Sequence, residues 1–392
     1  RMGACNVPGF LRVDDFLKKK FERRGKVVLA EVLAPLIGTR GKRPPLPDPG
    51  SVRSLLVIRQ HNQMGDMLLA VPAFRGIRKR FPDARVTLLA AEINSGVMRN
   101  NPFIDEVITW SKKRNRKNPL AFLRFIRRLR EEHFDILIVL NTVSFSVTSM
   151  LLGAVSGAAW RAGSNSRPFG TDLTSKYYHL EFPLPGEEEL LAMHESEHNL
   201  YPLRAIGIEE NDLSSVLVPF EWEERECGEF TAAAFGDGPY AVIHPGAGKV
   251  KNIWPPERFA EVSGVLLERH GISSVAVRGP VDDIYFARFL DACTSPPQVI
   301  SCPTVGFLGA LMRDAAVSVC NDTGVAHIAG AVGARCAEVF GPTDPHRWKP
   351  VSDTVIAVKP DDGIVDSVTT GDVMKVIDGL LARSTVTGAG SG

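Results

Sequence analysis

Asp66 is the first residue in this sequence whose type and setting point to chemistry. It lies in the stretch LLVIRQHNQMGDMLLAVPAF, where a short apolar run is followed by a polar, glycine-containing turn and then by an apolar stretch of helical character. An aspartate directly ahead of a helix commonly caps it. A carboxylate at such a turn can also take a proton from an incoming hydroxyl group. Residue type alone does not separate these two interpretations.

A second group of chemically capable residues follows an apolar strand that ends at Cys320. Asp322, Thr323, Gly324 and His327 lie in a segment that predicts a turn and then a helix of small residues beginning near Gly324. The free N–H groups and the positive dipole end of such a helix suit a phosphate or a diphosphate. Taken singly, Asp322 and Thr323 can be caps and His327 a buried histidine. Together with the next segment, they predict a phosphate site.

The next segment is IHPGAGKVKNIWPPERF, in which a strand ends at His244 and a glycine-containing loop follows. Gly246 lets the backbone approach a ligand closely, and Lys249 and Lys251 supply positive charge in the same loop. A departing diphosphate needs such neutralisation. The alternative for the lysines is simple exposure to solvent. The prolines of WPP predict the first turn of the next helix.

Asp282 and its neighbour Asp283 follow the second strand of the C-terminal series. An acid at this place commonly accepts hydrogen bonds from ribose hydroxyls in nucleotide-binding α/β domains, although it can also cap a helix. The sequence contains neither GxGxxG nor GxxxxGK[ST], so it does not predict a dinucleotide fingerprint or a P-loop. No Asp-x-Asp pair in a loop context indicates a catalytic metal. Metal independence is the resulting hypothesis.

The elements that would position these residues alternate between strands and helices. In the N-terminal half, strands are expected at 55–58, 84–91, 106–110 and 134–140, and helices at 67–80 and 120–133. In the C-terminal half, strands are expected at 240–246, 273–279, 316–320 and 336–341, and helices at 255–271, 281–293, 305–315 and 324–333. This alternation predicts an α/β fold of two Rossmann-like, doubly wound domains that face a central cleft.

Three regions are predicted along the chain. Residues 1–50 form a basic extension with a possible amphipathic helix and a proline-rich linker, residues 51–212 an N-terminal domain, and residues 213–392 a C-terminal domain. The formal net charge of +1 conceals an asymmetry: residues 1–180 carry 31 Lys and Arg against 14 Asp and Glu, and the remainder carries 15 against 31. The basic half favours an anionic partner such as a phosphorylated lipid or a membrane surface. The alternative is that the basic half and the acidic half each present a solvated face and that these faces attract each other across an interface.

The six cysteines are far apart and show no zinc-binding spacing, which favours a reducing compartment. No apolar run reaches the roughly 18 residues that a transmembrane helix needs. The expected location is therefore the cytoplasm, with peripheral association at the inner membrane through residues 1–50 as an option. Packing of the N-terminal helix on the body of the protein is the other option.

Three segments, in this order and spacing, resemble glycosyltransferase family 9, the ADP-heptose:lipopolysaccharide heptosyltransferases. They are IRQHNQMGDMLLAVPAFRGIRKRFPDARVTLL, HPGAGKVKNIWPPERFAEV and NDTGVAHIAGAVGARCAEVFGPTDPHRW. The resemblance covers roughly Ser51 to the C-terminus, and its most specific part is the DTGxxH…FGPTDP block. It implies a GT-B architecture, an inverting and metal-independent mechanism without a cofactor, and a nucleotide-sugar donor, ADP-heptose first, held mainly by the C-terminal domain.

The resemblance also implies residue roles. Asp66 is similar to the family's catalytic base, and Asp322, Thr323 and Gly324 to its donor-binding triplet, with His327 beside them. Asp282 stands where the family usually has a glutamate that binds ribose.

Two segments depart from the family pattern. The family commonly has Lys one residue before Trp, whereas here Asn252 and Ile253 separate Lys251 from Trp254, so either Lys249 or Lys251 is the expected phosphate ligand. The segment RQHNQM also departs from the pattern, and it contains two candidate contacts for the acceptor or for phosphate, Arg59 and Gln63.

The predicted function is therefore transfer of a heptose or a related sugar from a nucleoside diphosphate sugar to a hydroxyl group of a lipopolysaccharide core or a similar glycolipid. Two alternatives remain open at this point. One is a GT-B-type nucleotide-sugar epimerase, which would need no acceptor. The other is a non-catalytic protein that binds a nucleotide sugar or an anionic polymer. The basic segment has few aromatic residues for base stacking, so nucleic acid is not an expected partner.

Overall fold

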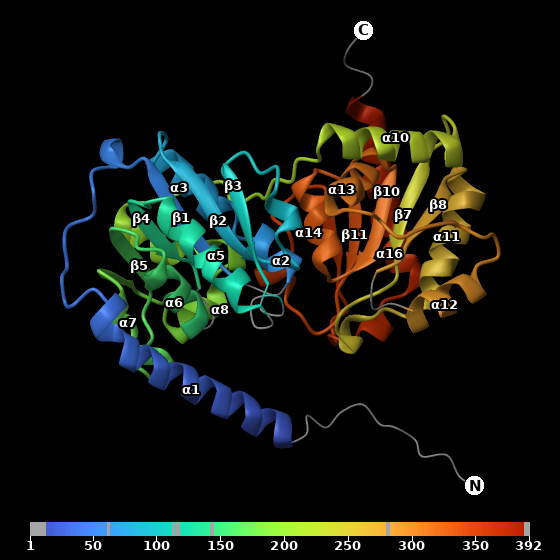
Figure 1. Cartoon of the computed structure of the whole chain (residues 1–392). Helices are drawn as coiled ribbons and strands as arrows, with labels where there is room; N and C mark the ends of the chain where they lie inside the picture. Colours follow the sequence, from blue (N-terminus) through green and yellow to red (C-terminus); the bar gives the residue numbers. More distant parts are fainter. Residues whose placement is uncertain are drawn as a thin grey trace. The chain divides into compact units, whose positions relative to one another are not determined.

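The computed structural model describes residues 13–60, 63–111, 114, 118–141, 145–279 and 283–387. Strands and helices alternate along the chain, as the sequence predicts (Figure 1). The strands are β1 Ser54–Arg59, β2 Arg85–Ala91, β3 Glu106–Trp110, β4 Ile136–Val139, β5 Trp160–Ser164, β6 Leu180–Phe182, β7 Tyr240–His244, β8 Ser273–Val277, β9 Gln298–Ile300, β10 Val317–Asn321, β11 Cys336–Val339 and β12 Val355–Val358.

The helices up to residue 200 are α1 Val13–Ile37, α2 Met64–Leu68, α3 Val71–Arg80, α5 Pro119–Glu131, α6 Val147–Val155, α7 Thr174–Tyr177, α8 Glu187–Ala192 and α9 Glu195–Leu200. The later helices are α10 Glu221–Phe235, α11 Pro256–His270, α12 Asp283–Ala292, α13 Val305–Asp314, α14 Gly324–Ala331, α15 Pro345–Trp348 and α16 Thr370–Thr387.

The strands form two six-stranded sheets, with the orders β3-β2-β1-β4-β5-β6 and β12-β11-β10-β7-β8-β9. The pairs β1–β4, β4–β5, β5–β6 and β2–β3 are parallel in the first sheet. In the second sheet β10 pairs in parallel with β7 and with β11. Each sheet runs outward from its first strand and then reverses on the other side, which is the doubly wound order. The predicted fold class is confirmed.

By its internal contacts the chain divides into two compact units. Residues 1–58 and 113–184 make up the first unit, and residues 59–112 and 185–392 make up the second. The second unit therefore contains α2, α3, β2 and β3 together with the whole C-terminal sheet. All the site residues from Arg59 onward that are described below belong to this second unit.

The core of the second unit lies against one face of its sheet. Buried side chains from β7, β10 and β11 pack there on side chains of α11, α12 and α16. The aromatic members of this core include Trp254, just before α11, Phe259 in α11 and Phe289 in α12. These strands are buried along their whole length because parallel strands are covered on both faces. Burying one such large side chain contributes about 1.5 to 3 kcal/mol. This core fixes the carboxyl ends of β7 and β10, where the candidate site residues begin.

The helix expected at 67–80 is two helices, α2 and α3, separated by Leu69 and Ala70. Pro72 lies in the first turn of α3. Its ring and missing N–H exclude it from a helix interior, and it disfavours helical backbone at the residue before it. One continuous helix was therefore the wrong expectation, and the residues around Asp66 form a separate short turn.

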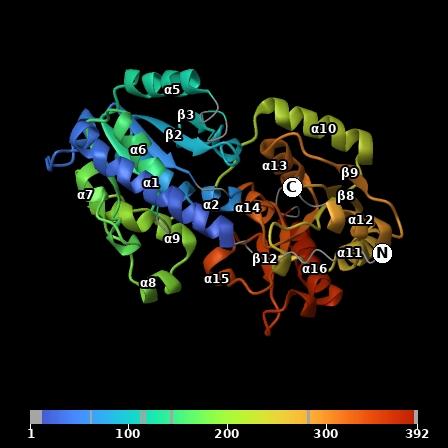
Figure 2. The same ribbon diagram turned by 60° about the horizontal axis from the view of Figure 1, so that its bottom comes forward.

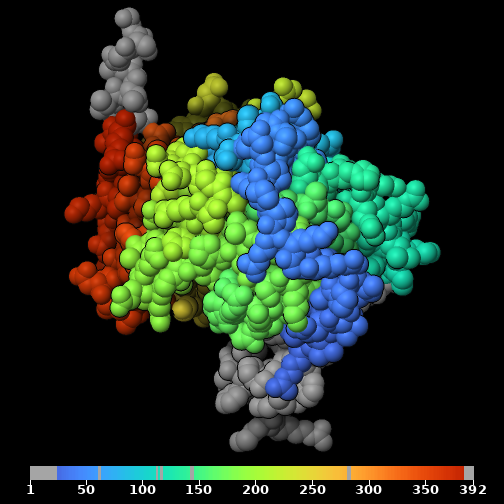
Figure 3. All heavy atoms as spheres, turned by 90° about the vertical axis from the view of Figure 1, so that its left-hand side faces the viewer, coloured from blue at the N-terminus to red at the C-terminus, as the bar shows by residue number. Residues whose placement is uncertain are grey.

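The N-terminal helix α1 packs on α6 and α7 within the first unit, and Figure 2 shows α6 between α1 and α5. The Tyr177 hydroxyl donates to the Ala30 carbonyl at 2.5 Å, and Arg161 Nη1 donates to the Ile37 carbonyl at 2.7 Å. Figure 3 shows this segment lying on the surface of later residues. Packing of the helix on the body is confirmed for its C-terminal part. Val32 and Leu36 of α1 nevertheless remain exposed, by 67% and 73%.

Candidate active site

Asp66 lies in the first turn of α2, directly after β1, and its side chain is half-buried. The residue at the N-cap position of α2 is the exposed Gln63, which makes no side-chain capping bond. Asp66 is therefore not the N-cap of this helix. A carboxylate in a first helical turn still interacts favourably with the helix dipole.

The short helix α2 packs against the head of α14 through glycines. A Cβ added to Gly65 would lie 2.5 Å from His327 Cδ2, and one added to Gly324 would lie 3.4 Å from Met64 Cβ. Real Cβ contacts are essentially never as short as the first of these distances. Because Gly65 has no side chain, the turn that carries Asp66 can pack closely against α14.

His327 is buried beside Asp66, and burial lowers the pKa of its imidazole to about 4 although the charge of Asp66 opposes this shift. The imidazole is therefore neutral at neutral pH. Thr323 is the N-cap of α14, with its hydroxyl oxygen accepting from the Val325 N–H at 3.3 Å. The capping interpretation of Thr323 is thus correct. The start of α14, which is the positive end of its dipole, remains the place where a phosphate is predicted to bind.

The glycine-containing loop after β7 is held to the end of β10 by Asn321, which is fully buried. Its Nδ2 donates to the carbonyls of Pro245 and Gly246 at 3.0 and 3.1 Å, and its Oδ1 accepts from the Trp254 N–H at 2.9 Å. The Trp254 side chain is also fully buried, with Nε1 donating to the Val368 carbonyl at 2.8 Å. Both ends of the lysine-bearing loop are therefore fixed.

Asn252 is a site residue that sequence reasoning did not find. It is buried, and its Nδ2 donates to Asp322 Oδ2 at 2.9 Å. Burial raises the pKa of the Asp322 carboxyl, while Thr343 and the charges of Lys249 and Lys251 oppose this shift. The available signal was the departure of this loop from the Lys-x-Trp pattern, which places Asn252 at the lysine position.

The other expected site residues occupy different surroundings. Lys249 and Lys251 are both exposed in the loop, and their placement does not favour one of them. Arg59 is fully buried at the end of β1, and its Nη2 donates to the Asp66 carbonyl at 2.8 Å. Asp282 lies outside the described residues.

A set of buried charged groups next to α2 was also missed by sequence reasoning. Glu195 Oε1 lies 3.2 Å from His198 Nδ1, and both side chains are buried. His194 caps α9, and its Nε2 lies 2.8 Å from the Lys349 carbonyl. Burial lowers the pKa of the His194 imidazole, so it is neutral and donates from Nε2. All three residues belong to α9 or to its N-cap, and a helix of six residues is too short to show a periodic pattern in the sequence.

Within the part of the chain that the structure describes, no group of three or more His, Cys, Asp or Glu side chains is arranged to hold a metal ion. A pocket of about 560 Å³ lies beside the lysine loop and is lined by Lys251, Tyr285 and Arg288 among others. Neither Asp322 nor His327 lines this pocket. The pocket therefore shares Lys251 with the predicted phosphate site but does not include the residues at the start of α14.

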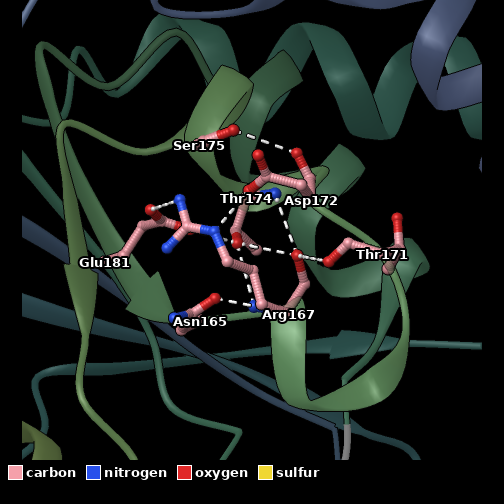
Figure 4. Close-up of polar contacts among 8 residues, drawn as sticks. Asn165, Arg167, Thr171, Asp172, Thr174, Ser175 and Glu181 are labelled. Atoms are coloured by element: carbon pink, nitrogen blue, oxygen red, sulfur yellow. Dashed lines mark hydrogen bonds and ion pairs between the residues drawn. The ribbon is translucent and has the colours of Figure 1, made fainter.

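A polar cluster in the first unit follows β5 (Figure 4). Arg167 pairs with Asp172 at 3.0 Å and with Glu181 at 3.1 Å, and the Thr174 hydroxyl donates to Glu181 at 2.6 Å. The Arg167 N–H donates to Asn165 Oδ1 at 2.9 Å. Asp172 and Glu181 compensate the charge of the Arg167 guanidinium. The contacts of this cluster therefore hold the loop between β5 and β6 in place.

Comparison with known proteins decides the family. The model of glycosyltransferase family 9 (heptosyltransferase) matches residues 122–375. The chain belongs to this family. As a family 9 glycosyltransferase it is 27% identical over 300 residues to lipopolysaccharide heptosyltransferase 3 of Escherichia coli, covering 74% of this chain and 85% of that protein. The expected family resemblance is confirmed, and the relatives named by this comparison are enzymes that transfer sugars.

Solved structures show the same fold for this family 9 chain. A family 9 glycosyl transferase from Veillonella parvula matches with a TM-score of 0.72 and 21% identity, covering 86% of this chain and 99% of that chain. The ADP-heptose lps heptosyltransferase II of E. coli matches with a TM-score of 0.70 and 21% identity, covering 85% and 99%. The GT-B architecture with two Rossmann-like domains is confirmed.

Proposed function

We propose that this family 9 glycosyltransferase transfers a heptose or a related sugar from a nucleoside diphosphate sugar to a hydroxyl group of a lipopolysaccharide core or a similar glycolipid, with inversion and without a metal. The observation that carries the proposal is the packing of the Asp66 turn on α14, whose N-terminus bears Thr323 and Gly324. The names of the relatives favour ADP-heptose as the donor.

In the proposed reaction, Asp66 takes the proton of the acceptor hydroxyl as the general base. The hydroxyl oxygen attacks the anomeric carbon, and the bond from that carbon to the diphosphate oxygen breaks on the opposite face. A single displacement of this kind inverts the anomeric configuration. The products are the glycosylated acceptor and a nucleoside diphosphate, and the proton ends on Asp66.

The departing charge is stabilised in this proposal by the N-terminus of α14 and by a lysine of the loop after β7. Asp322, held by Asn252, accepts hydrogen bonds from sugar hydroxyls, and the close backbone at Gly246 lets the diphosphate approach. His327 contributes as a neutral donor-side contact, and Lys249 and Lys251 share the phosphate role. Asp282 is proposed as the ribose ligand.

The acceptor side is assigned to residues 51–212 and the donor side to residues 213–392. Gln63, which is exposed at the start of α2, is the proposed contact for the acceptor. Arg59 was expected to share that contact. Its complete burial makes a different role more suitable.

We also propose that the enzyme meets its glycolipid at the anionic cytoplasmic face of the inner membrane. Two exposed surfaces of the first unit support this location. Helix α5 exposes Leu120 and Leu123 by 69% and 61% beside four arginines, and α1 exposes Val32 and Leu36. Apolar and basic residues on one helix suit the boundary between headgroups and acyl chains. Among the described helices, none combines the length and apolarity needed to cross a bilayer.

Asp66→Asn tests the base most directly because it keeps the size of the side chain and removes its basicity. Transfer from ADP-heptose should fall by roughly 10²- to 10⁴-fold, while binding of ADP stays near the wild-type level. Product analysis by nuclear magnetic resonance should show the inverted anomer, and chelation by EDTA should leave the rate unchanged. Unchanged turnover in Asp66→Asn would exclude Asp66 as the base, and conversion of donor alone would favour an epimerase.

A further inference from the structure

The short helix α2, which carries Asp66, needs hydrogen-bond donors from outside the helix for its C-terminal carbonyl groups. A helix leaves its last carbonyl groups without intrahelical partners, and in α2 these make up most of the helix. Side chains outside α2 donate hydrogen bonds to two of these carbonyls and to the carbonyl of Leu69, the C-cap residue. Arg59 Nη2 donates to the Asp66 carbonyl at 2.8 Å, Ser215 Oγ to the Leu68 carbonyl at 2.7 Å, and Asn199 Nδ2 to the Leu69 carbonyl at 3.2 Å.

Each of the three donors is itself fixed. Arg59 and Asn199 are fully buried, at the end of β1 and in α9. Asn199 Nδ2 also donates to the Glu195 carbonyl at 2.8 Å, within its own helix. Asn199 and Ser215 are 130 and 147 residues away in sequence from the carbonyls that they bind, and Arg59 belongs to the strand before α2. These contacts add to the helical bond from the Leu69 N–H to the Gly65 carbonyl.

Ser215 belongs to a segment, residues 212–217, that is bonded along its length. Arg75 donates from Nη1 to the Asp212 carbonyl at 2.6 Å and from Nη2 to the Ser214 carbonyl at 2.9 Å. The Leu217 N–H donates to the Ala331 carbonyl, at the end of α14, at 3.1 Å. The segment that holds the Asp66 turn is therefore also bonded to the helix that carries His327.

Arg59 adds charge to this arrangement. Burial lowers the pKa of its guanidinium to about 10, and the charges of Asp66 and Glu195 oppose that shift, so Arg59 is still a cation at neutral pH. A buried cation next to a carboxylate favours the charged form of the carboxylate. The charged or titratable groups around this turn on other elements are Arg59 in β1, His327 in α14, His194, Glu195 and His198 before and in α9, and Arg347 in α15.

We propose that Arg59, Asn199 and Ser215 are positioning residues that hold the Asp66 turn in place, and that Arg59 also keeps the Asp66 carboxylate charged for its role as the base. The first part rests on the hydrogen bonds to the three carbonyls. The second part rests on the proposed function of Asp66. Arg59 then acts through Asp66 and does not contact the substrate.

The two parts predict different kinetic results. Arg59→Met removes both the clamp and the charge, so kcat should fall by roughly 10- to 100-fold with the KM for the donor unchanged. The acid limb of the pH–rate profile should move to higher pH. Arg59→Lys should restore the position of the acid limb but only part of kcat, because an ammonium group lacks the planar fork of the guanidinium.

Ser215→Ala removes a neutral clamp, so it should lower kcat without moving the acid limb. Ser214→Ala is its matched control. The Ser214 hydroxyl bonds to Asp212 on an exposed part of the same segment, and its removal should change neither quantity. If Arg59→Met does not fold, Ser215→Ala still tests the clamp.

A measurement that does not depend on activity separates this inference from the proposed function. Hydrogen exchange of peptides spanning residues 64–74 should be faster in Ser215→Ala than in Ser214→Ala, whatever reaction the enzyme catalyses. Equal exchange in the two variants would overturn the clamp. An Arg59→Met enzyme with a wild-type acid limb would overturn the electrostatic role. If the wild-type enzyme did not transfer sugar, the proposed function would be contradicted. The hydrogen-exchange result would still test the positioning role of Ser215.

Discussion

Asn321 holds the glycine-containing loop after β7 to the end of β10. Its amide nitrogen donates to two carbonyls of the loop after β7, while its oxygen accepts the N–H of Trp254. A side chain with the same shape but without the nitrogen would keep one of these bonds and turn the other two into repulsive contacts.

Asn321→Asp is therefore expected to destabilise the protein by about 2 to 4 kcal/mol, since it loses two donors and places a buried charge against two carbonyl oxygens. Urea unfolding measures the change in free energy. Asn211→Asp makes the same chemical change on an exposed side chain and should have an effect of less than about 0.5 kcal/mol. Equal effects in the two variants would show that the burial of Asn321 does not matter.

His327 makes the stability of the fold depend on pH. The pKa of its imidazole is about 4 in the folded protein because of burial, against about 6.5 in an unfolded chain. Between these values the unfolded state binds more protons. The free energy of unfolding therefore falls as the pH is lowered from about 6.5 to 4, by up to about 3 kcal/mol from this one group.

His327→Gln should reduce the slope of unfolding free energy against pH in that window, as measured by urea unfolding at several pH values. His133→Gln removes an exposed histidine and serves as the control. A slope unchanged by His327→Gln would mean that other groups, such as His194, whose pKa is also lowered by burial, dominate the pH dependence.

At the scale of the element, most helices and strands could be predicted because their sequence signals are local. The strands of a parallel sheet are apolar along their length, and helix starts are marked by residues such as Thr323. The break between α2 and α3 was missed because the apolar pattern continues through Pro72, and the site partner Asn252 was missed because its contact with Asp322 is tertiary. Residue type predicted which groups could do chemistry, but not which of them were already bonded.

The helix α5 yields a prediction about the membrane. Arg124→Glu combined with Arg130→Glu reverses two charges on its exposed surface and should weaken binding to vesicles containing phosphatidylglycerol by at least tenfold, at about 1 kcal/mol for each arginine near such a surface. Cosedimentation at low ionic strength measures this, and binding of the wild type should decrease with added salt.

The control for this experiment is Arg269→Glu with Lys375→Glu, which changes the net charge equally on two exposed residues of α11 and α16. This variant should bind the vesicles as the wild type does. If both double variants lose binding to the same extent, net charge and not the α5 surface controls the association. Vesicles of phosphatidylcholine alone should bind none of the proteins strongly.

At the scale of the whole molecule, a bound ligand should increase the free energy of unfolding. ADP-heptose or ADP at about 100 times its dissociation constant should stabilise the protein by about 2.7 kcal/mol and raise its melting temperature by roughly 5 °C. UDP and GDP sugars should have smaller effects, as measured by thermal shift at matched concentrations. A larger shift with UDP or GDP sugars would contradict ADP-heptose as the donor while leaving sugar transfer possible.

The contact between Gly65 and His327 has a consequence for how this enzyme can be changed. Because a Cβ at residue 65 would meet the imidazole of residue 327, a larger residue at position 65 requires a smaller one at position 327. In a mutant library that varies residues 65 and 327 separately, most variants with a larger residue at 65 would have a steric clash. A library that pairs a larger residue at 65 with a smaller one at 327 would avoid this clash. Two positions that are far apart in the sequence thus have to be varied together in design.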